Sequence, residues 1–295
     1  MTPKHIPVLV GEVVSLLDLK PGCVVVDATF GLGGHSQAMF KKISPKGILI
    51  GIERDAQTIK IASQNQDFKK PNGKSFIVHG NYTDIDPIVK SCGHSRVDAV
   101  LFDLGLSSLQ LDLERGFSFR VDAPLDMRFD TSSGITAREI VNSYPKDDLA
   151  NLIWEFGQER QSRKIAQAIY DHRRKQPIAT TQELADIVAE AKGGRRGKIH
   201  PATLTFQALR IAVNQELANI KEGLPEAFEL LNVGGRLAVI SYHSLEDKIV
   251  KNYFRDLAKS KQANLITKKP VIPSRVEINS NPRARSAKLR VLEKI

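Results

Sequence analysis

Short apolar runs recur along the first hundred residues, and most of them end in a polar or acidic residue. Their length and their content of β-branched residues are typical of buried strands. Helical spacing of apolar residues precedes the first run and separates several of the others, as in 8–19 and 56–65. Alternating strands and helices predict an α/β fold with a parallel, Rossmann-like sheet. The four predicted strands are 23–28, 47–55, 75–82, which runs into a loop, and 96–105, which is apolar up to its carboxylate.

The next strand pattern, Gly235–Ser241, begins more than a hundred residues later. That distance is too long for a single crossover connection. The chain between shows helical patterns at 137–144, 147–156, 161–175, 181–192 and 202–231, the last with a break near Gly223. We therefore predict an all-helical lobe, residues 108–214, inserted between strands four and five of a domain made of 1–107 and 215–295. Residues 246–258 predict a further helix, and 265–267 with 287–292 predict a closing antiparallel hairpin.

Composition and length are those of a globular protein, with 41% hydrophobic and 26% charged residues in 295. No run of eighteen apolar residues and no signal-peptide pattern occurs, so we expect a cytoplasmic protein without a membrane partner. The two cysteines, Cys23 and Cys92, have neither metal-ligand nor disulfide spacing. The oligomeric state stays open between monomer and dimer.

Positive charge is clustered along the chain. The formal net charge is +10, and Arg255–Ile295 alone holds eleven Lys/Arg against three Asp/Glu. Further clusters lie at Lys192–Lys198 and His172–Lys175. Such clusters neutralise phosphates, so they favour a nucleic-acid partner over a merely solubilising surface. The residues that we expect to contact phosphate near the end of the chain are Arg283, Arg285, Lys288 and Arg290.

A glycine-rich loop follows the first predicted strand. The strand ends at Asp27, the loop is Gly31-Leu32-Gly33-Gly34, and a helical pattern begins at Ser36. A strand, a glycine-rich turn and a helix N-terminus together form a cradle for a nucleotide-type cofactor. The spacing differs from the dinucleotide G-x-G-x-x-G and suits a cofactor without a pyrophosphate, such as S-adenosylmethionine (AdoMet). An ordinary tight turn is the alternative.

Three acidic residues support the cofactor interpretation. Asp27, Glu53 and Asp103 each end a predicted strand, and the carboxyl ends of parallel strands meet at the ligand-binding edge of such sheets. At the end of the second strand, Glu53 is placed to accept hydrogen bonds from both ribose hydroxyls. Tyr82, after the third strand, would either lie against an adenine or cover the core.

Nine segments in a fixed order extend these motifs over nearly the whole chain. They are 5–9, 27–36, 103–112, 115–120, 124–128, 200–203, 206–211, 241–247 and 281–290. Together they resemble the bacterial 16S rRNA cytosine-N4 methyltransferase family. The resemblance implies a class I methyltransferase with a helical lobe after strand four, and AdoMet-dependent methylation of N4 of a cytosine in the decoding centre. It also implies 16S rRNA, within the small ribosomal subunit, as the partner.

The resemblance implies the AdoMet contacts as well. They fall on Gly33, Gly34, His35, Glu53, Tyr82, Asp103 and Gln110. The family more often has Asp and Phe where this chain has Glu53 and Tyr82. Both differences retain the carboxylate or the ring, so they change fine geometry only.

The cytosine N4 amine is a weak nucleophile because its lone pair is delocalised into the ring. The enzyme must hold the amine in line with the methyl group and accept its hydrogens. Asp103, just after strand four, is the first candidate acceptor, although the resemblance also assigns it an AdoMet contact. His243 is the second catalytic candidate, with a structural role as the alternative. Methyl transfer from a sulfonium needs no Lewis acid, and we expect no metal.

Two points stay open in this interpretation. The residue that stacks on the target base is one of Phe117, Phe119, Tyr242 and His243. Asp126 and Arg128 would either pair with each other or touch RNA, and the ion pair is favoured.

Three other functions are the alternatives. The first is a protein that binds AdoMet only as a structural ligand. Asp103→Ala separates it from an enzyme, because only the enzyme has a turnover rate that the substitution can lower. A DNA amino-methyltransferase is disfavoured because Asp103–Leu106 lacks the Pro-Pro-aromatic sequence typical of that class. A nicotinamide oxidoreductase is disfavoured by the spacing of the glycine loop.

Overall fold

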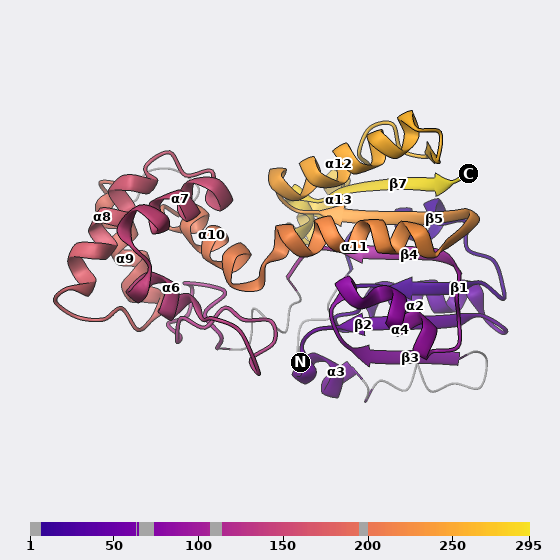
Figure 1. Cartoon of the computed structure of the whole chain (residues 1–295), viewed down its shortest axis with the longest axis horizontal. Helices are drawn as coiled ribbons and strands as arrows, with labels where there is room; N and C mark the ends of the chain where they lie inside the picture. The colour runs from indigo at the N-terminus through magenta and orange to yellow at the C-terminus, as the bar shows by residue number, and fades with distance from the viewer. Residues whose placement is uncertain (1–6, 63, 65–73, 107–113, 195–199) are drawn as a thin grey trace. The chain divides into compact units, whose positions relative to one another are not determined.

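The computed structural model describes residues 7–62, 64, 74–106, 114–194 and 200–295. The chain divides into two compact units (Figure 1). The first, the sheet unit, consists of residues 1–107 and 217–295. The second, the helical unit, consists of residues 108–216, which lie between strands β4 and β5.

A seven-stranded sheet forms the centre of the sheet unit, in the order β3-β2-β1-β4-β5-β7-β6. Strands β1 to β5 are parallel, whereas β7 runs antiparallel to both β5 and β6 (Figure 1). This confirms the predicted α/β fold class, and it confirms that the last two strands close the sheet in antiparallel fashion. The strands are β1 Val24–Asp27, β2 Ile48–Glu53, β3 Lys74–His79, β4 Val97–Asp103, β5 Leu231–Ser241, β6 Ala263–Leu265 and β7 Lys288–Lys294.

Both faces of the sheet are covered, which explains why its strands read as continuous apolar runs. Successive side chains alternate between faces, so Val25 belongs to one core cluster and Val26 to the other. Helices α1 (Val10–Leu16) and α2 (Gly34–Ile43) contribute to the Val25 cluster. The Val26 cluster contains residues of α4 (Ile85–Ser91), α11 (Glu216–Leu230) and α12 (Ser244–Lys259). The remaining short helices of this unit are α3 (Ala56–Ala62), η2 (Tyr82–Asp84), α13 (Arg275–Ser280) and η3 (Pro282–Ser286).

The direction of the crossovers reverses between β1 and β4. From β1 the chain proceeds outward through β2 to β3, and from β4 it proceeds the other way to β5. Parallel α/β sheets bind ligands outside the carboxyl ends of the strands at such a switch point. Asp27, Glu53 and Asp103 are the last residues of their strands, so all three lie at this edge.

The helical unit has a core of its own, made mainly of Leu, Ile, Val and Ala side chains. The described helices are α6 Ala137–Ser143, α7 Lys146–Gly157, α8 Ser162–Arg173, α9 Thr181–Ala191 and α10 Thr203–Asn214. Each starts within two residues of a helix predicted from the sequence. Helix α6 starts with a capping box, in which Thr136 and Glu139 satisfy each other's backbone N–H groups. No described helix in either unit is long and apolar enough to span a membrane.

The predicted helix break near Gly223 is wrong. Helix α11 continues through Gly223, and the break falls at Gln215, whose φ of 52° is left-handed. Gly223 serves close packing instead, because a Cβ at this position would lie 2.7 Å from the Tyr82 ring. The start of strand five also differs from the prediction, since β5 begins at Leu231 and not at Gly235.

Candidate active site

The loop after β1 is fixed by the carboxylate of Asp27. This side chain is only 1% exposed, and it accepts hydrogen bonds from the Ser36 hydroxyl at 2.6 Å and from the Thr29 N–H at 3.2 Å. Burial raises the pKa of Asp27 above its ordinary value, while the Ser36 hydrogen bond opposes that rise. Gly31 and Gly33 have φ of 54° and 79°, a backbone region in which a side chain is strained. The loop therefore brings bare backbone and the N-terminus of α2 to the edge of the sheet.

Glu53 joins the end of β2 to the same loop. Its two carboxylate oxygens accept the backbone N–H of Gly31 at 2.8 Å and that of Asp55 at 2.9 Å. Burial is the main cause that raises the pKa of Glu53 to about 7, and these backbone hydrogen bonds oppose it. Each carboxylate oxygen can accept a second hydrogen bond. Glu53 is therefore rigidly held and still able to accept hydrogen bonds from a pair of hydroxyls.

Asn81 lies at the corresponding position after β3, and sequence reasoning missed it. Its Oδ1 is buried and has no hydrogen-bond partner among the described residues. A buried polar atom without a partner is costly, and native structures usually supply one. A polar residue two positions after a strand that ends at the ligand-binding edge was the available signal in the sequence.

Tyr82, next to Asn81, is 9% exposed. Its ring packs edge-on against Phe102, with centroids 5.2 Å apart, and belongs to the core cluster on that face. The core-covering alternative thus describes the packing of this ring, while its contact with an adenine stays a prediction.

Asp103 receives contacts from three segments. Its backbone N–H donates to the Thr29 hydroxyl at 2.6 Å, and Oδ1 of its carboxylate accepts from the Tyr242 hydroxyl at 2.8 Å. Oδ2 lies 3.5 Å from Nδ1 of His35, too far for a strong hydrogen bond. Burial, together with the nearby Asp103 carboxylate, raises the pKa of Tyr242 well above its ordinary value. Tyr242 consequently stays protonated and donates to Asp103, which leaves Oδ2 able to accept another hydrogen bond.

His35, in the first turn of α2, is anchored from the other side. Its Nε2 lies 2.8 Å from the Val8 carbonyl oxygen, which can only accept, so Nε2 carries a proton. This bond ties the N-terminal segment to the loop that follows β1. The first backbone N–H groups of α2, including that of His35, have no partner within the helix, as at every helix N-terminus.

His243 is the N-cap of α12. Its ring accepts from the Glu246 backbone N–H, and the Glu246 carboxylate accepts from the backbone N–H groups of Tyr242 and His243. Nε2 of His243 lies 3.1 Å from Oε1 of the fully buried Glu246, but the pair does not meet hydrogen-bond geometry. The capping role is the structural alternative considered for His243, and its proton-accepting role stays a prediction.

The four expected phosphate contacts near the end of the chain differ in their surroundings. Arg290 is 8% exposed and donates to Asp247 at 2.7 Å, so its assignment to phosphate is wrong. Lys288 shares the same carboxylate at 3.1 Å, and its side chain is 40% exposed. Arg283 and Arg285 are exposed. In the third basic cluster, Arg173 donates to two backbone carbonyls at the end of α6 and is likewise not available to RNA.

The predicted ion pair in the helical unit is confirmed. Arg128 donates to both carboxylate oxygens of Asp126 at 2.8 Å. The stacking candidates of this unit are engaged with other rings. Phe117 stacks on Phe129 at a centroid distance of 5.5 Å, and Phe119 packs against His200 and Phe206.

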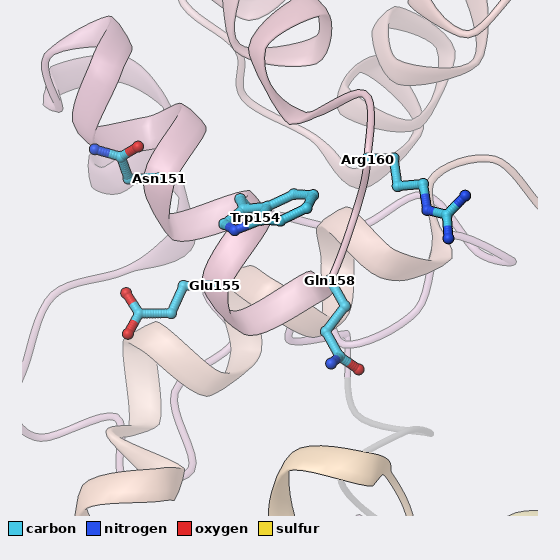
Figure 2. A pocket seen from close by; sticks show the side chains of 5 residues that line it. All are labelled: Asn151, Trp154, Glu155, Gln158 and Arg160. Atoms are coloured by element: carbon cyan, nitrogen blue, oxygen red, sulfur yellow. The ribbon is translucent and has the colours of Figure 1, made fainter.

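An exposed indole lies on the surface of the helical unit. Trp154, the only tryptophan in the chain, is 57% exposed on α7. It lines an open pocket of about 820 Å³ with Asn151, Glu155, Gln158 and Arg160 (Figure 2). The pocket thus offers a flat aromatic face, amide groups, one guanidinium and one carboxylate.

Some sequence predictions lie outside the described residues. These are Gln110 and Arg195–Lys198 of the second basic cluster.

The fold and this edge are those of an α/β enzyme that binds a nucleotide-like cofactor where the strand order reverses. A sequence model of the MraW methylase family matches residues 2–295, and the chain belongs to that family. It is 47% identical to ribosomal RNA small subunit methyltransferase H of Caldicellulosiruptor bescii, over 99% of each chain. It is 48% identical to the protein of the same name from Persephonella marina, again over 99% of each. An rRNA methylase structure from Streptococcus thermophilus aligns over 99% of both chains with 14% identity and a TM-score of 0.46.

Proposed function

We propose that this methylase transfers the methyl group of AdoMet to N4 of a cytosine in the decoding centre of 16S rRNA, in the small ribosomal subunit of the cytoplasm. Membership in a methylase family, together with the glycine loop and the three acidic strand ends, carries the proposal. The names of the relatives support small-subunit rRNA as the substrate.

The residues at the sheet edge fit AdoMet. Glu53 is held by two backbone N–H groups and can accept from both ribose hydroxyls. Gly34 and His35 offer backbone N–H groups and the positive end of the α2 dipole to the carboxylate of the methionine portion, and Gly33, whose own N–H donates to the Phe30 carbonyl, provides the left-handed turn before them. The unpartnered Oδ1 of Asn81 fits the exocyclic amine of adenine.

Three further contacts complete the proposed cofactor site. They are Tyr82 beside the adenine, Asp103 toward the methionine portion, and Gln110. The positions of Asn81 and Tyr82, consecutive after β3, support an adenine at that strand end.

Bound AdoMet supplies a methyl group on a sulfonium, and its carbon–sulfur bond breaks as the amine nitrogen forms the new bond. The protein must then orient the amine and take up one proton. Asp103 is suited to the orienting role because Tyr242 fixes Oδ1 and leaves Oδ2 to accept a hydrogen from N4. A carboxylate that accepts this hydrogen as nitrogen gains positive charge stabilises the transition state more than the ground state.

His243 is the second proposed proton acceptor. It follows β5, beside Tyr242, at the same edge of the sheet. Its Nδ1 accepts the Glu246 backbone N–H at the start of α12, so Nε2 is the nitrogen left to take up a proton. Nε2 lies 3.1 Å from the Glu246 carboxylate. This pair is the proposed destination of the proton that the amine loses after transfer.

We further propose that the helical unit recognises the RNA. Unpaired bases stack on exposed aromatic side chains, and arginine binds the adjoining phosphates. Trp154 and Arg160 offer this combination on α7 and the turn that follows it (Figure 2).

The cofactor assignment is tested by calorimetric titration with AdoMet. Wild type is expected to bind, and Asn81→Ala is expected to bind about tenfold more weakly because it removes one buried hydrogen bond. Asn142→Ala, which alters an asparagine of the helical unit, serves as the control and should bind like wild type. Binding that is equal in Asn81→Ala and wild type would remove Asn81 from the site.

A further inference from the structure

A second cavity lies in the sheet unit, beside the candidate catalytic residues. It has a volume of about 320 Å³, near the lower end of the ~300–1,000 Å³ typical of small-ligand pockets. It is lined by Tyr242, His243 and Ser244 and, from other segments, by Ile272, Arg285 and Lys288 among others. Tyr242 also donates to Asp103, so one side chain links this cavity to the proposed acceptor.

Two cations, Arg285 and Lys288, line the cavity, and the carboxylates of Glu246 and Glu277 act on its Tyr242 wall. Asp247 is shared by Lys288 and Arg290, so two cations face one carboxylate. Arg285 adds a third cation, and it is exposed and has no ion pair among the described residues. An exposed guanidinium that lines a cavity and has no carboxylate partner among the described residues is suited to bind phosphate in bidentate fashion.

Apolar side chains line the cavity as well. Ile272 is 66% exposed, and Pro273 and Ile278 line the wall next to it. Two neighbouring exposed apolar side chains, Ile272 and Val276, are unusual on a surface otherwise rich in charge. A cavity lined by both apolar and cationic side chains matches a ribose or base attached to a phosphate.

We propose that this cavity binds the phosphate and ribose of a nucleotide adjacent to the target cytosine, with Arg285 contacting the phosphate and Lys288 reinforcing the charge. The inference rests on the proposed rRNA substrate and adds to it the surface that holds the RNA strand beside the acceptor. Because Tyr242 forms both the cavity wall and the hydrogen bond to Asp103, a strand held here keeps its neighbouring base near that carboxylate.

The test measures equilibrium binding of in vitro transcribed 16S rRNA, without AdoMet, over a series of salt concentrations. Arg285→Ala should weaken binding about tenfold at low salt. It should also reduce the slope of log affinity against log salt concentration by the amount expected for one lost phosphate contact. Arg285→Lys should retain most of the affinity because the charge remains. The matched control is Arg255→Ala, which removes an exposed arginine of α12 that pairs with Asp256 outside the cavity. It should lower the affinity much less.

A steady-state assay on small subunits that lack the methyl group provides the second readout. Arg285→Ala should raise KM and leave kcat nearly unchanged, because the residue binds the strand and not the reacting atoms. If wild type methylates rRNA and Arg285→Ala matches Arg255→Ala in affinity, salt slope and KM, the cavity proposal is overturned while the proposed function stands. If wild type binds neither rRNA nor subunits, both proposals are overturned.

Discussion

At the scale of single residues, Asp103 depends on one hydrogen bond for its orientation. The Tyr242 hydroxyl donates to Oδ1 at 2.8 Å, whereas His35 lies 3.5 Å from Oδ2. Gly105 makes this arrangement possible, because a Cβ there would lie 2.6 Å from the Tyr242 ring. The orientation of the proposed acceptor is thus determined by a tyrosine from another strand end.

Replacing Tyr242 by Phe should therefore lower kcat without unfolding the protein. A hydrogen bond to a charged group contributes about 1.5–3 kcal/mol, which corresponds to roughly a tenfold to hundredfold loss in rate. Single-turnover methyl transfer measures the loss, and the thermal midpoint checks folding. Tyr253→Phe is the control, because that tyrosine lies on α12 and its ring packs against Phe228. Equal rates for the Tyr242→Phe and Tyr253→Phe variants would contradict the positioning role.

Glu53 gives the protein a predictable pH dependence. Its pKa is about 7 in the folded chain against an ordinary value of 4.5, so between these values the folded state holds a proton that the unfolded state has lost. The free energy of unfolding should therefore fall as pH rises from about 4.5 to about 7, by up to about 3 kcal/mol from this group.

Urea unfolding of wild type and Glu53→Gln over this pH range isolates the effect, since glutamine does not titrate. Across this window the unfolding free energy of wild type should fall relative to that of Glu53→Gln as the pH rises. In the same window AdoMet should bind more tightly to wild type as pH rises, because ionised Glu53 is the better acceptor for ribose hydroxyls. A constant difference between the two proteins would contradict the raised pKa.

At the scale of elements, two helical glycines with different surroundings make a matched pair. A Cβ at Gly223 in α11 would lie 2.7 Å from the Tyr82 ring, whereas a Cβ at Gly11 in α1 would have nothing within 4 Å. Alanine generally stabilises a helix relative to glycine by about 1 kcal/mol. Gly11→Ala should follow that rule.

Gly223→Ala should instead destabilise the protein by about 1–3 kcal/mol, because the methyl group overpacks a buried ring. Chemical denaturation of both variants measures the two effects. If the Gly223→Ala variant is as stable as the Gly11→Ala variant, the close packing of Gly223 against the Tyr82 ring is contradicted.

Most elements were predictable because their apolar pattern is unambiguous. Buried parallel strands are apolar on both faces, and helices α7 to α10 keep a regular apolar stripe. The break at Gln215 was missed because glycine normally signals an interruption, while here Gly223 is required by a neighbour distant in sequence. Close approach between elements is a tertiary fact that local pattern does not contain.

The candidate site was likewise predictable only in part. Asp27, Glu53 and Asp103 were recognisable because a strand end fixes the position of its last side chain. Partners from distant segments were not recognisable, because alternation along a strand does not indicate which residue faces each side chain. Examples are the hydrogen bond from Tyr242 to Asp103 and the ion pair between Arg290 and Asp247. Arg290 was for that reason assigned to phosphate when it forms a buried ion pair.

At the scale of the whole molecule, the single tryptophan allows RNA contact with the helical unit to be followed directly. All tryptophan emission comes from Trp154, which is 57% exposed. Wild-type emission should be strongly quenched by acrylamide, and added rRNA should shield the indole if a base stacks on it. Trp154→Phe should bind rRNA nearly as well, since the aromatic face remains, and Trp154→Ala should bind several-fold more weakly. Full binding of rRNA with unchanged acrylamide quenching would show that the pocket of Figure 2 does not take a base.

The central claim is that the edge of the sheet catalyses methyl transfer to cytosine N4. The most direct measurement incubates labelled AdoMet with small subunits from cells lacking the enzyme, digests the rRNA to nucleosides and identifies the labelled product by mass. Wild type should yield N4-methylcytidine, and Asp103→Ala should retain rRNA binding while its rate falls by a factor of about 10²–10⁴. Label in any other nucleoside, or an Asp103→Ala rate equal to wild type, would contradict the account.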